Sequence, residues 1–304
     1  MDTAVRELGL APISLLPAIA GSATGDDPST PQTRARVLEE VKQTLADGRR
    51  QIRAAFEAGA PVHHTMAANA DLIDQLLRDL LDYAMTYVFP APNPTTGDRI
   101  CVAAVGGYGR GELAPWSDID LLFLLPYKKT PRSEQVVEYV LYMLWDTGLK
   151  VGHATRTVDE CLRLARDDTT IATSLLESRW IWGEPVLYED LRRRFLSELV
   201  QGTGPAFLEA KLAERDQRHR RLGDSRYVLE PNVKDGKGGL RDLHTLYWIA
   251  KYLYQVEDVA DLAGRCVLTR AELRRFEKAE EFLSTVRCHL HYLTDRPEDR
   301  LTFD

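Results

Sequence analysis

Apolar residues recur with a helical period over the first part of the chain, after a leader that has no such pattern. Residues 1–33 include the run GSATGDDPSTPQT, whose small and turn-forming residues predict a flexible leader. In residues 34–59 and 67–88 the apolar positions fall on one face of a helix, which predicts two amphipathic helices. The run FPAPNPTTGD at 89–98 ends this pattern.

The pattern then changes to short apolar runs bounded by turn residues, which are typical of buried strands. RICVAAV at 99–105 and IDLLFLL at 119–125 predict two strands, and LKVGHATRT at 149–157 predicts a third. Between the last two, EQVVEYVLYMLWDTG at 134–148 predicts a helix that closes on Gly148. The sequence therefore predicts a small α/β unit in this part of the chain.

The remainder of the chain has mostly helical patterns. One stretch, LEPNVKDGKGGLRDLH at 229–244, interrupts them. The expected fold class is α+β, with a first domain at 34–160 that includes the N-terminal helices and a mainly helical domain at 161–304. The helices expected after the α/β unit are 159–166, 169–182, 186–200, 204–222, 240–255 and 270–293.

Composition and charge narrow the class of protein. The 304 residues carry a net charge of −7, which argues against a nucleic-acid partner. The four cysteines are widely spaced without a CxxC pair, so a structural zinc site is not expected and reduced thiols are. Reduced thiols are typical of a cytoplasmic protein. Because the chain has no run of 18 apolar residues, we expect no membrane span.

Two carboxylates open the second predicted strand, directly after a glycine-rich loop. Because side chains two apart in a strand share a face, Asp118 and Asp120 project together, roughly 7 Å apart at their Cα atoms. A divalent cation such as Mg²⁺ relieves the repulsion between two such charges. Gly106 and Gly107 let backbone N–H groups approach a phosphate. The combination is typical of phosphoryl or nucleotidyl transfer, whereas a solvated strand end is the alternative.

The residues GGYGRGELAPWSDIDLLFL resemble the signature of the nucleotidyltransferase superfamily related to DNA polymerase β, which has a small mixed sheet with helices. Together with VGHATRTVDEC, ESRWIWGE and EPNVKDGKGGLRDLHTLYWIAKY, they resemble the bifunctional uridylyltransferase/uridylyl-removing enzymes of nitrogen regulation. The resemblance runs from about residue 35 to the C-terminus. It implies transfer of UMP from UTP to a tyrosine hydroxyl of the PII signalling protein, with release of pyrophosphate.

The resemblance also implies roles for single residues. Asp118 and Asp120 would be the catalytic carboxylates that bind Mg²⁺, and Gly106 and Gly107 would hold the triphosphate. The residues assigned to nucleotide binding from the same motifs are Arg110, Ser117, Lys234 and Arg241. Members of the superfamily often carry a third carboxylate on the next strand, but LKVGHATRT has no acid. The candidates left open for that role are Asp146, Asp159, Glu112 and Glu230.

The run NVKDGKGGLRDLH is dense in cations and glycines, with Lys237 beside the two cations already named. One interpretation is a second binding site for the nucleotide phosphates or for PII. The other is a solvated turn that caps the next helix. His153 on the third strand is expected to be structural rather than a ligand. His289 and His291 lie on different faces of a helix, so a shared metal is not expected. The basic run RHRR at 218–221 predicts a solvated helix face.

Other functions stay open on the sequence alone. The glycine loop and acid pair also occur in adenylyltransferases, and a regulatory module that binds nucleotide or PII without turnover is a further alternative. No histidine is followed by aspartate, so the HD hydrolase domain of the family is not expected here, nor are the ACT domains that sense glutamine. We interpret the chain as an N-terminal fragment that carries the transferase and helical domains.

Overall fold

The structure, a computed structural model, describes residue 8 and residues 27–225, 227–256, 260–265 and 267–303. The chain divides into two compact units, and each is described by itself. The first unit contains Ser117–Cys161, Glu177–Arg192 and the described residues up to Leu113. The second contains Ala114–Trp116, Leu162–Leu176 and the described residues from Arg193 onward.

The first unit is built on a four-stranded mixed sheet with the strand order β3-β2-β1-β4. The strands are β1 (Cys101–Ala104), β2 (Ile119–Leu125), β3 (Val151–Thr157) and β4 (Arg179–Gly183). Strand β1 pairs antiparallel with both β2 and β4, whereas β2 and β3 run parallel. The expected small mixed sheet with helices, and with it the α+β class, is confirmed.

Strand β4 corrects a sequence prediction. The expected helix over 169–182 is wrong in its second half, because α8 covers only Thr169–Leu176 and RWIWG then forms β4. Aromatic and β-branched residues favour a strand where a partner is present. Here the partner is β1, about 80 positions earlier in the chain. The first unit consequently includes Glu177–Arg192 in addition to the segment that ends at Cys161.

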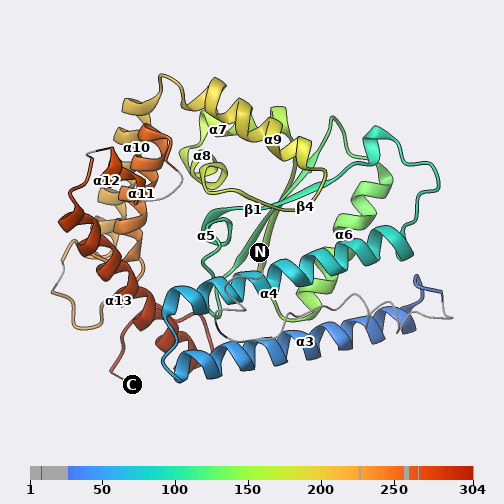
Figure 1. Cartoon of the computed structure of the whole chain (residues 1–304), viewed down its shortest axis with the longest axis horizontal. Helices are drawn as coiled ribbons and strands as arrows, with labels where there is room; N and C mark the ends of the chain where they lie inside the picture. Colours follow the sequence, from blue (N-terminus) through green and yellow to red (C-terminus); the bar gives the residue numbers. More distant parts are fainter. Residues whose placement is uncertain (1–7, 9–26, 226, 257–259, 266, 304) are drawn as a thin grey trace. The chain divides into compact units, whose positions relative to one another are not determined.

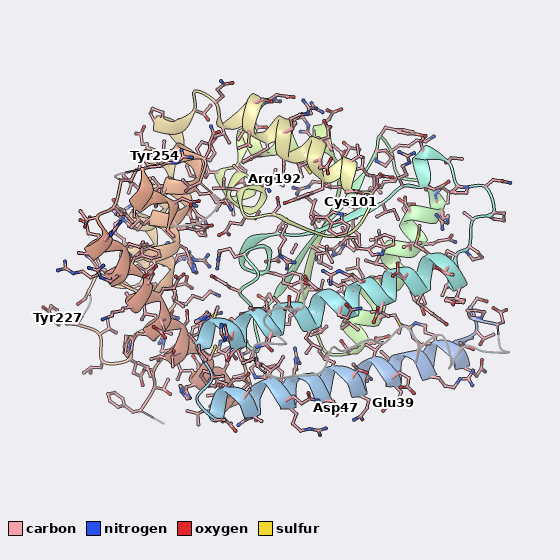
Figure 2. The ribbon with its side chains drawn as sticks, viewed as in Figure 1. Glu39, Asp47, Cys101, Arg192, Tyr227 and Tyr254 are labelled. Atoms are coloured by element: carbon pink, nitrogen blue, oxygen red, sulfur yellow. The ribbon has the colours of Figure 1, made fainter. Side chains whose placement is uncertain are left out.

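Helices cover the sheet and form the core with it. Helices α3 (Pro31–Glu57) and α4 (Val62–Tyr83) pack along one another as two long helices (Figure 1). Side chains such as Glu39 and Asp47 project from α3 on the side away from α4 (Figure 2). The fully buried core joins α4 to β1 and β2 through Leu77, Leu80, Leu81, Val102, Ala104, Leu121 and Phe123.

The other elements of the first unit are short or connect strands. They are η1 (Ala84–Val88), η2 (Thr96–Asp98), α5 (Gly106–Gly109), α6 (Pro131–Asp146) and α9 (Pro185–Arg194). Helix α6 begins with a Thr130 cap and ends just before Gly148, whose φ of +84° suits a residue beyond a helix end. Helix α3 begins at Pro31, so residues 31–33 of the expected leader are helical. Residues 1–7 and 9–26 of that leader lie outside the described residues.

The second unit is mainly helical over its described residues, as expected. Its helices are α8, the η3 turn (Phe195–Val200), α10 (Gly204–Arg221), α11 (Leu240–Tyr254), α12 (Asp261–Gly264) and α13 (Arg270–Thr294), while α7 (Val158–Asp167) begins in the first unit. Phe207 of α10 stacks on Tyr252 of α11 with ring centroids 3.8 Å apart. In the parts of the chain that the structure describes, no helix is both long and apolar enough to cross a membrane.

Candidate active site

The glycine loop forms a single helical turn directly after β1. This turn, α5, begins at Gly106, which adopts a φ of +60° that favours glycine. The backbone N–H of Val105 donates to the carbonyl of Asp120 at 3.0 Å, which fixes the start of the turn against β2. Gly109 packs so closely on the carbonyl of Glu177 that a Cβ atom would overlap it. The backbone therefore favours glycine at position 106 and requires it at position 109.

Asp120 lies between the glycine turn and strand β3. A Cβ atom built on Gly106 would lie 3.4 Å from Oδ2 of Asp120, and one built on Gly152 would collide with Oδ1. Gly152 is the register partner of Asp120 across the parallel pair β2–β3. Asp118 is exposed and directly precedes β2, whereas Asp120 is half-buried within it. The structure thus brings Asp120 and Gly106 together as the sequence predicts.

This arrangement has the chemistry of a cation and phosphate site. The carboxylates of Asp118 and Asp120 at a strand start offer the hard oxygen atoms that Mg²⁺ prefers. Apart from the adjoining backbone, the described atoms nearest to the Cβ positions of Gly106 and Gly107 are Oδ2 of Asp120 at 3.4 Å and a guanidinium nitrogen of Arg110 at 3.6 Å. The residues present therefore fit a divalent cation, which the carboxylates of Asp118 and Asp120 would hold.

Arg110 and Ser117 lie in the same loop. The Arg110 guanidinium donates to Oε1 of Glu177 at 2.6 Å and to Oε2 of Glu112 at 3.1 Å. Burial opposes its charge, but the two glutamates raise the pKa of Arg110 above its usual value. Ser117 is half-buried directly before Asp118. For both residues, nucleotide binding stays a prediction.

A buried ionic cluster behind the glycine turn was not predicted from the sequence. Asp74 of α4 is fully buried and accepts a hydrogen bond from the hydroxyl of Tyr108 in α5 at 2.6 Å. Arg179 of β4 donates to both Asp74 oxygens, at 2.5 and 3.0 Å, and Arg78 donates at 3.0 Å. The cluster ties α4, α5 and β4 together. The feature of the sequence that could have indicated this cluster is Asp74, a charged residue among the apolar positions of the helix predicted at 67–88.

Asp71, one turn before Asp74 on the same helix, is affected by this cluster. Burial, and then the charge of Asp74, raise the pKa of Asp71 to about 6. Arg179 and Arg78 act in the opposite direction. Asp71 is thus a half-buried carboxyl that holds its proton more tightly than a solvated one.

The candidates for a third carboxylate are dispersed. Glu112 pairs with Arg110, and Asp146 pairs with Arg34 at 2.5 Å. Glu230 accepts from the backbone N–H of Phe303 at 3.4 Å, and Asp159 is exposed at the start of α7. The other polar residue considered on β3, His153, is exposed and stacks edge-on with Trp145, with ring centroids 5.9 Å apart.

The cations of residues 229–244 lie in the second unit and are paired within it. Lys234 pairs with Asp299 at 3.6 Å, and Arg241 pairs with Asp235 at 3.4 Å. Lys237 pairs with Asp224 at 2.8 Å. These pairings match the capped turn that was one of the two interpretations. A role of Lys234 and Arg241 in nucleotide binding stays a prediction.

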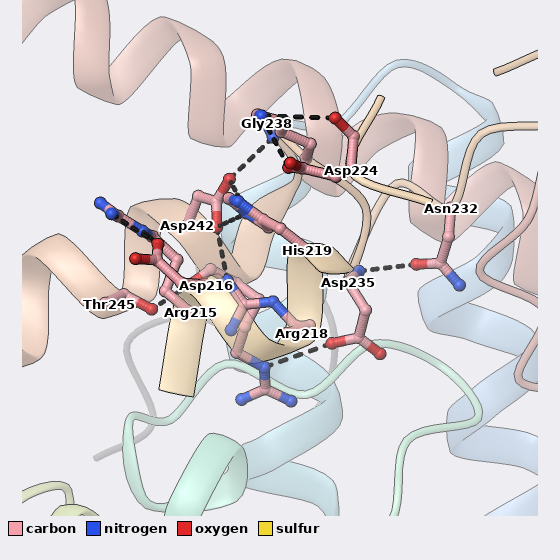
Figure 3. Close-up of polar contacts among 12 residues, drawn as sticks. Arg215, Asp216, Arg218, His219, Asp224, Asn232, Asp235, Gly238, Asp242 and Thr245 are labelled. Atoms are coloured by element: carbon pink, nitrogen blue, oxygen red, sulfur yellow. Dashed lines mark hydrogen bonds and ion pairs between the residues drawn. The ribbon is translucent and has the colours of Figure 1, made fainter. Parts of the chain in front are cut away.

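Asp242 at the start of α11 organises this turn (Figure 3). It accepts from the backbone N–H of Gly238 at 2.7 Å, from His219 at 2.9 Å and from Arg218. The side chains of Arg218 and His219 are 7% and 11% exposed. The solvated face predicted for 218–221 is therefore wrong for these two residues, because Asp242 provides a partner inside the unit.

The two histidines of α13 differ in burial, because His289 is exposed whereas His291 is buried. Their places on different faces of the helix predict this difference. His291 is fully buried; its Nδ1 accepts from the backbone N–H of Trp116 at 3.2 Å, and its Nε2 lies 3.3 Å from Asp299. Burial lowers the pKa of His291. Trp116 belongs to the same unit as His291 and precedes Asp118 by two residues in the chain.

Comparison with known proteins finds two family models that match parts of this chain. A family model described as a nucleotidyltransferase domain matches residues 96–176. A second, described as GlnD PII-uridylyltransferase, matches residues 206–304. The first match contains the glycine turn and both strand-start aspartates, and the second contains the cation-rich turn at 229–244.

Three similar proteins carry the printed name bifunctional uridylyltransferase/uridylyl-removing enzyme. The protein of Azospirillum brasilense is 59% identical over 286 residues, which cover 94% of this chain and 30% of that protein. Those of Rhodospirillum rubrum and Caulobacter vibrioides are 58% and 52% identical, each over 90% of this chain and 29% of the relative. The chain spans less than a third of the length of these relatives. Over 90% or more of its own length the chain is homologous to these relatives, and it contains a nucleotidyltransferase domain.

Proposed function

We propose that this chain transfers UMP from UTP to a tyrosine hydroxyl of the PII signalling protein and releases pyrophosphate. The observation that carries the proposal is the placement of the Asp120 carboxylate between Gly106 of the glycine turn and Gly152 of β3. The family provides the choice of uridine and of PII. UTP and PII are then the two substrates.

Different residues have different roles in the proposed reaction. Asp118 and Asp120 hold Mg²⁺, which supplies charge for the developing negative oxygens when it is bound. The backbone of Gly106 and Gly107 receives the phosphates. The tyrosine oxygen forms a bond to the α-phosphorus while the bond to the β-phosphate oxygen breaks, and the phenolic proton leaves to solvent. The Asp74 cluster holds the glycine turn from behind through Tyr108.

We place the reaction in the cytoplasm. Cys101, Cys161 and Cys288 are buried free thiols, which are common in a reducing compartment. Burial raises the pKa of each of these thiols to about 12. Because such thiols stay protonated, they are poor nucleophiles and carry no part of the proposed chemistry.

Pyrophosphate release tests the proposal. The chain is incubated with UTP, PII and Mg²⁺, and parallel samples omit PII or contain an excess of EDTA. We expect release only in the complete mixture, because the carboxylate pair needs its cation and UMP needs its acceptor.

The absence of an acid on β3 favours one alternative, a module that binds nucleotide or PII without turnover. Saturable Mg²⁺-dependent UTP binding without pyrophosphate release would support that alternative and contradict the transferase. Release that persists in EDTA would contradict the assignment of Asp118 and Asp120.

A further inference from the structure

In the part of the chain that the structure describes, strand β3 lies at the edge of the sheet and has a neighbour on one side only. The backbone N–H of Ile119 donates to the carbonyl of Lys150 at 2.9 Å, which fixes the phase of the parallel ladder. Backbone groups of alternate residues in a strand point to opposite edges. The N–H and C=O groups of His153 and Thr155 therefore point away from β2. Within the described ranges, no backbone-to-backbone hydrogen bond outside the sheet involves these two residues.

This edge lacks the devices that usually protect an edge strand. Proline, lysine and bulges commonly prevent pairing with a further strand. The seven residues VGHATRT contain neither proline nor lysine, and all seven pair with β2 without a break in register. Gly152 and His153 are exposed. The edge is thus open to a partner at His153 and Thr155, whereas the Trp145 indole donates to the Val151 carbonyl and Glu160 accepts from the Thr157 N–H at its two ends.

The exposed residue Gly152 of this edge lies beside Asp120. Gly152 is the register partner of Asp120, and the carboxylate lies over the Gly152 Cα, where a side chain would collide with Oδ1. On the face that carries Asp120, a glycine therefore leaves a path from the carboxylate to the free edge. A strand added outside β3 would lie about 4.8 Å beyond it.

We propose that the edge of β3 binds the protein acceptor, with the segment that carries the acceptor tyrosine added as a fifth strand. This inference rests on the proposed function and names the docking surface for its second substrate. Backbone hydrogen bonds to His153 and Thr155 hold the extended segment, as in other cases of strand addition. The tyrosine side chain crosses above Gly152 toward Asp120, so that its hydroxyl faces the α-phosphate.

Amide hydrogen exchange at single-residue resolution tests the docking directly. The full chain is measured alone and with PII and Mg²⁺, under conditions in which turnover is followed in the same samples. We expect exchange at the amides of His153 and Thr155 to slow on addition of PII. The amides of Gly152 and Ala154, which point toward β2, serve as internal controls and should change little.

A pair of variants gives an independent test. Thr155→Pro removes an outward N–H and blocks pairing, and edge strands tolerate proline where that N–H faces solvent. Thr155→Ala keeps the N–H and is the matched control. We expect Thr155→Pro to raise the KM for PII at least about tenfold, as the loss of one or two hydrogen bonds would. The Kd for UTP with Mg²⁺ should stay the same in both variants.

The outcomes separate this inference from the proposed function. Turnover without protection at His153 and Thr155, together with equal KM values for the two variants, would overturn the docking and leave the transferase intact. Protection without turnover would support the docking and contradict the transferase. Absence of both in the wild-type chain would overturn both. If Thr155→Pro fails to fold, the exchange data on the wild-type chain decide.

Discussion

At the scale of single residues, the charge of Asp120 matters most for the proposed transfer. We expect Asp120→Asn to reduce the rate of transfer by about 10²-fold or more, because one ligand charge for the cation is lost at the reacting phosphate. The fold should remain, since Asp120 is half-buried at a strand start and not a core residue. Initial rates and thermal unfolding are compared with those of Asp167→Asn, which changes an exposed aspartate at the end of α7. A near-normal rate in Asp120→Asn would refute the metal assignment.

Gly152 provides a second test at this scale. In Gly152→Ala the new methyl group collides with Oδ1 of Asp120, so the carboxylate must turn away from its present position. We expect the rate of transfer to fall at least about tenfold while the melting temperature changes little, since the site is an exposed strand edge. Gly264→Ala is the matched control, because nothing lies within 4 Å of that Cβ position. Equal rates in the two variants would show that the position of Asp120 does not matter.

Residues close together in sequence could be predicted, and distant partners could not. Asp118, Asp120 and Gly106 fall within 15 positions, and strand geometry alone places the two carboxylates on one face. Gly152 and Arg179 reach the site through strand pairing and an ion pair, which no local pattern encodes. For the same reason, the pairing of His219 with Asp242 could not be foreseen from a basic run.

At the scale of elements, helix α4 contributes residues to the hydrophobic core and also contains Asp71, whose carboxyl has a raised pKa. Because the pKa of Asp71 is about 6 in the folded chain, against 3.8 for a solvated aspartate, the folded chain binds this proton more tightly than the unfolded chain. The resulting stabilisation is fully present below about pH 4 and is lost as the pH rises through about 6.

We therefore expect Asp71→Asn, which stays neutral at all pH values, to increase the free energy of unfolding relative to the wild type at pH 8. The difference should shrink toward pH 4, where the wild-type carboxyl is also protonated. Urea unfolding at both pH values measures it, with Asp167→Asn as the control for loss of an exposed carboxylate. An Asp71→Asn protein that is less stable at pH 8 would show that the Asp71 charge is favourable in the fold.

The elements themselves were largely predictable, with one clear exception. Apolar periodicity predicted α3, α4 and α6, and short apolar runs predicted the first three strands within a few residues. Strand β4 was predicted as helix because RWIWG follows a helical pattern and owes its conformation to β1. The intrinsic propensity of such a segment predicts its conformation poorly, because pairing with a strand far away in the sequence determines that conformation.

At the scale of the whole molecule, the transferred base is not determined by the sheet or the glycine turn. Both would serve UTP and ATP alike, because in the proposed reaction the carboxylates and the backbone of Gly106 and Gly107 would contact only the cation and the phosphates. The proposed choice of uridine and of PII rests on the similar proteins, which are more than three times as long as this chain. A single measurement that detects the reaction, the transferred base and the acceptor residue together is therefore needed.

Mass spectrometry of PII provides that measurement. PII is incubated with the chain, Mg²⁺ and equal concentrations of UTP and ATP, and the modified residue is located by fragmentation. We expect an addition of the mass of one UMP on a tyrosine, absent when Asp120→Asn replaces the wild-type chain. An AMP-sized addition would contradict the choice of base, and unmodified PII beside a chain that binds UTP would contradict transfer itself.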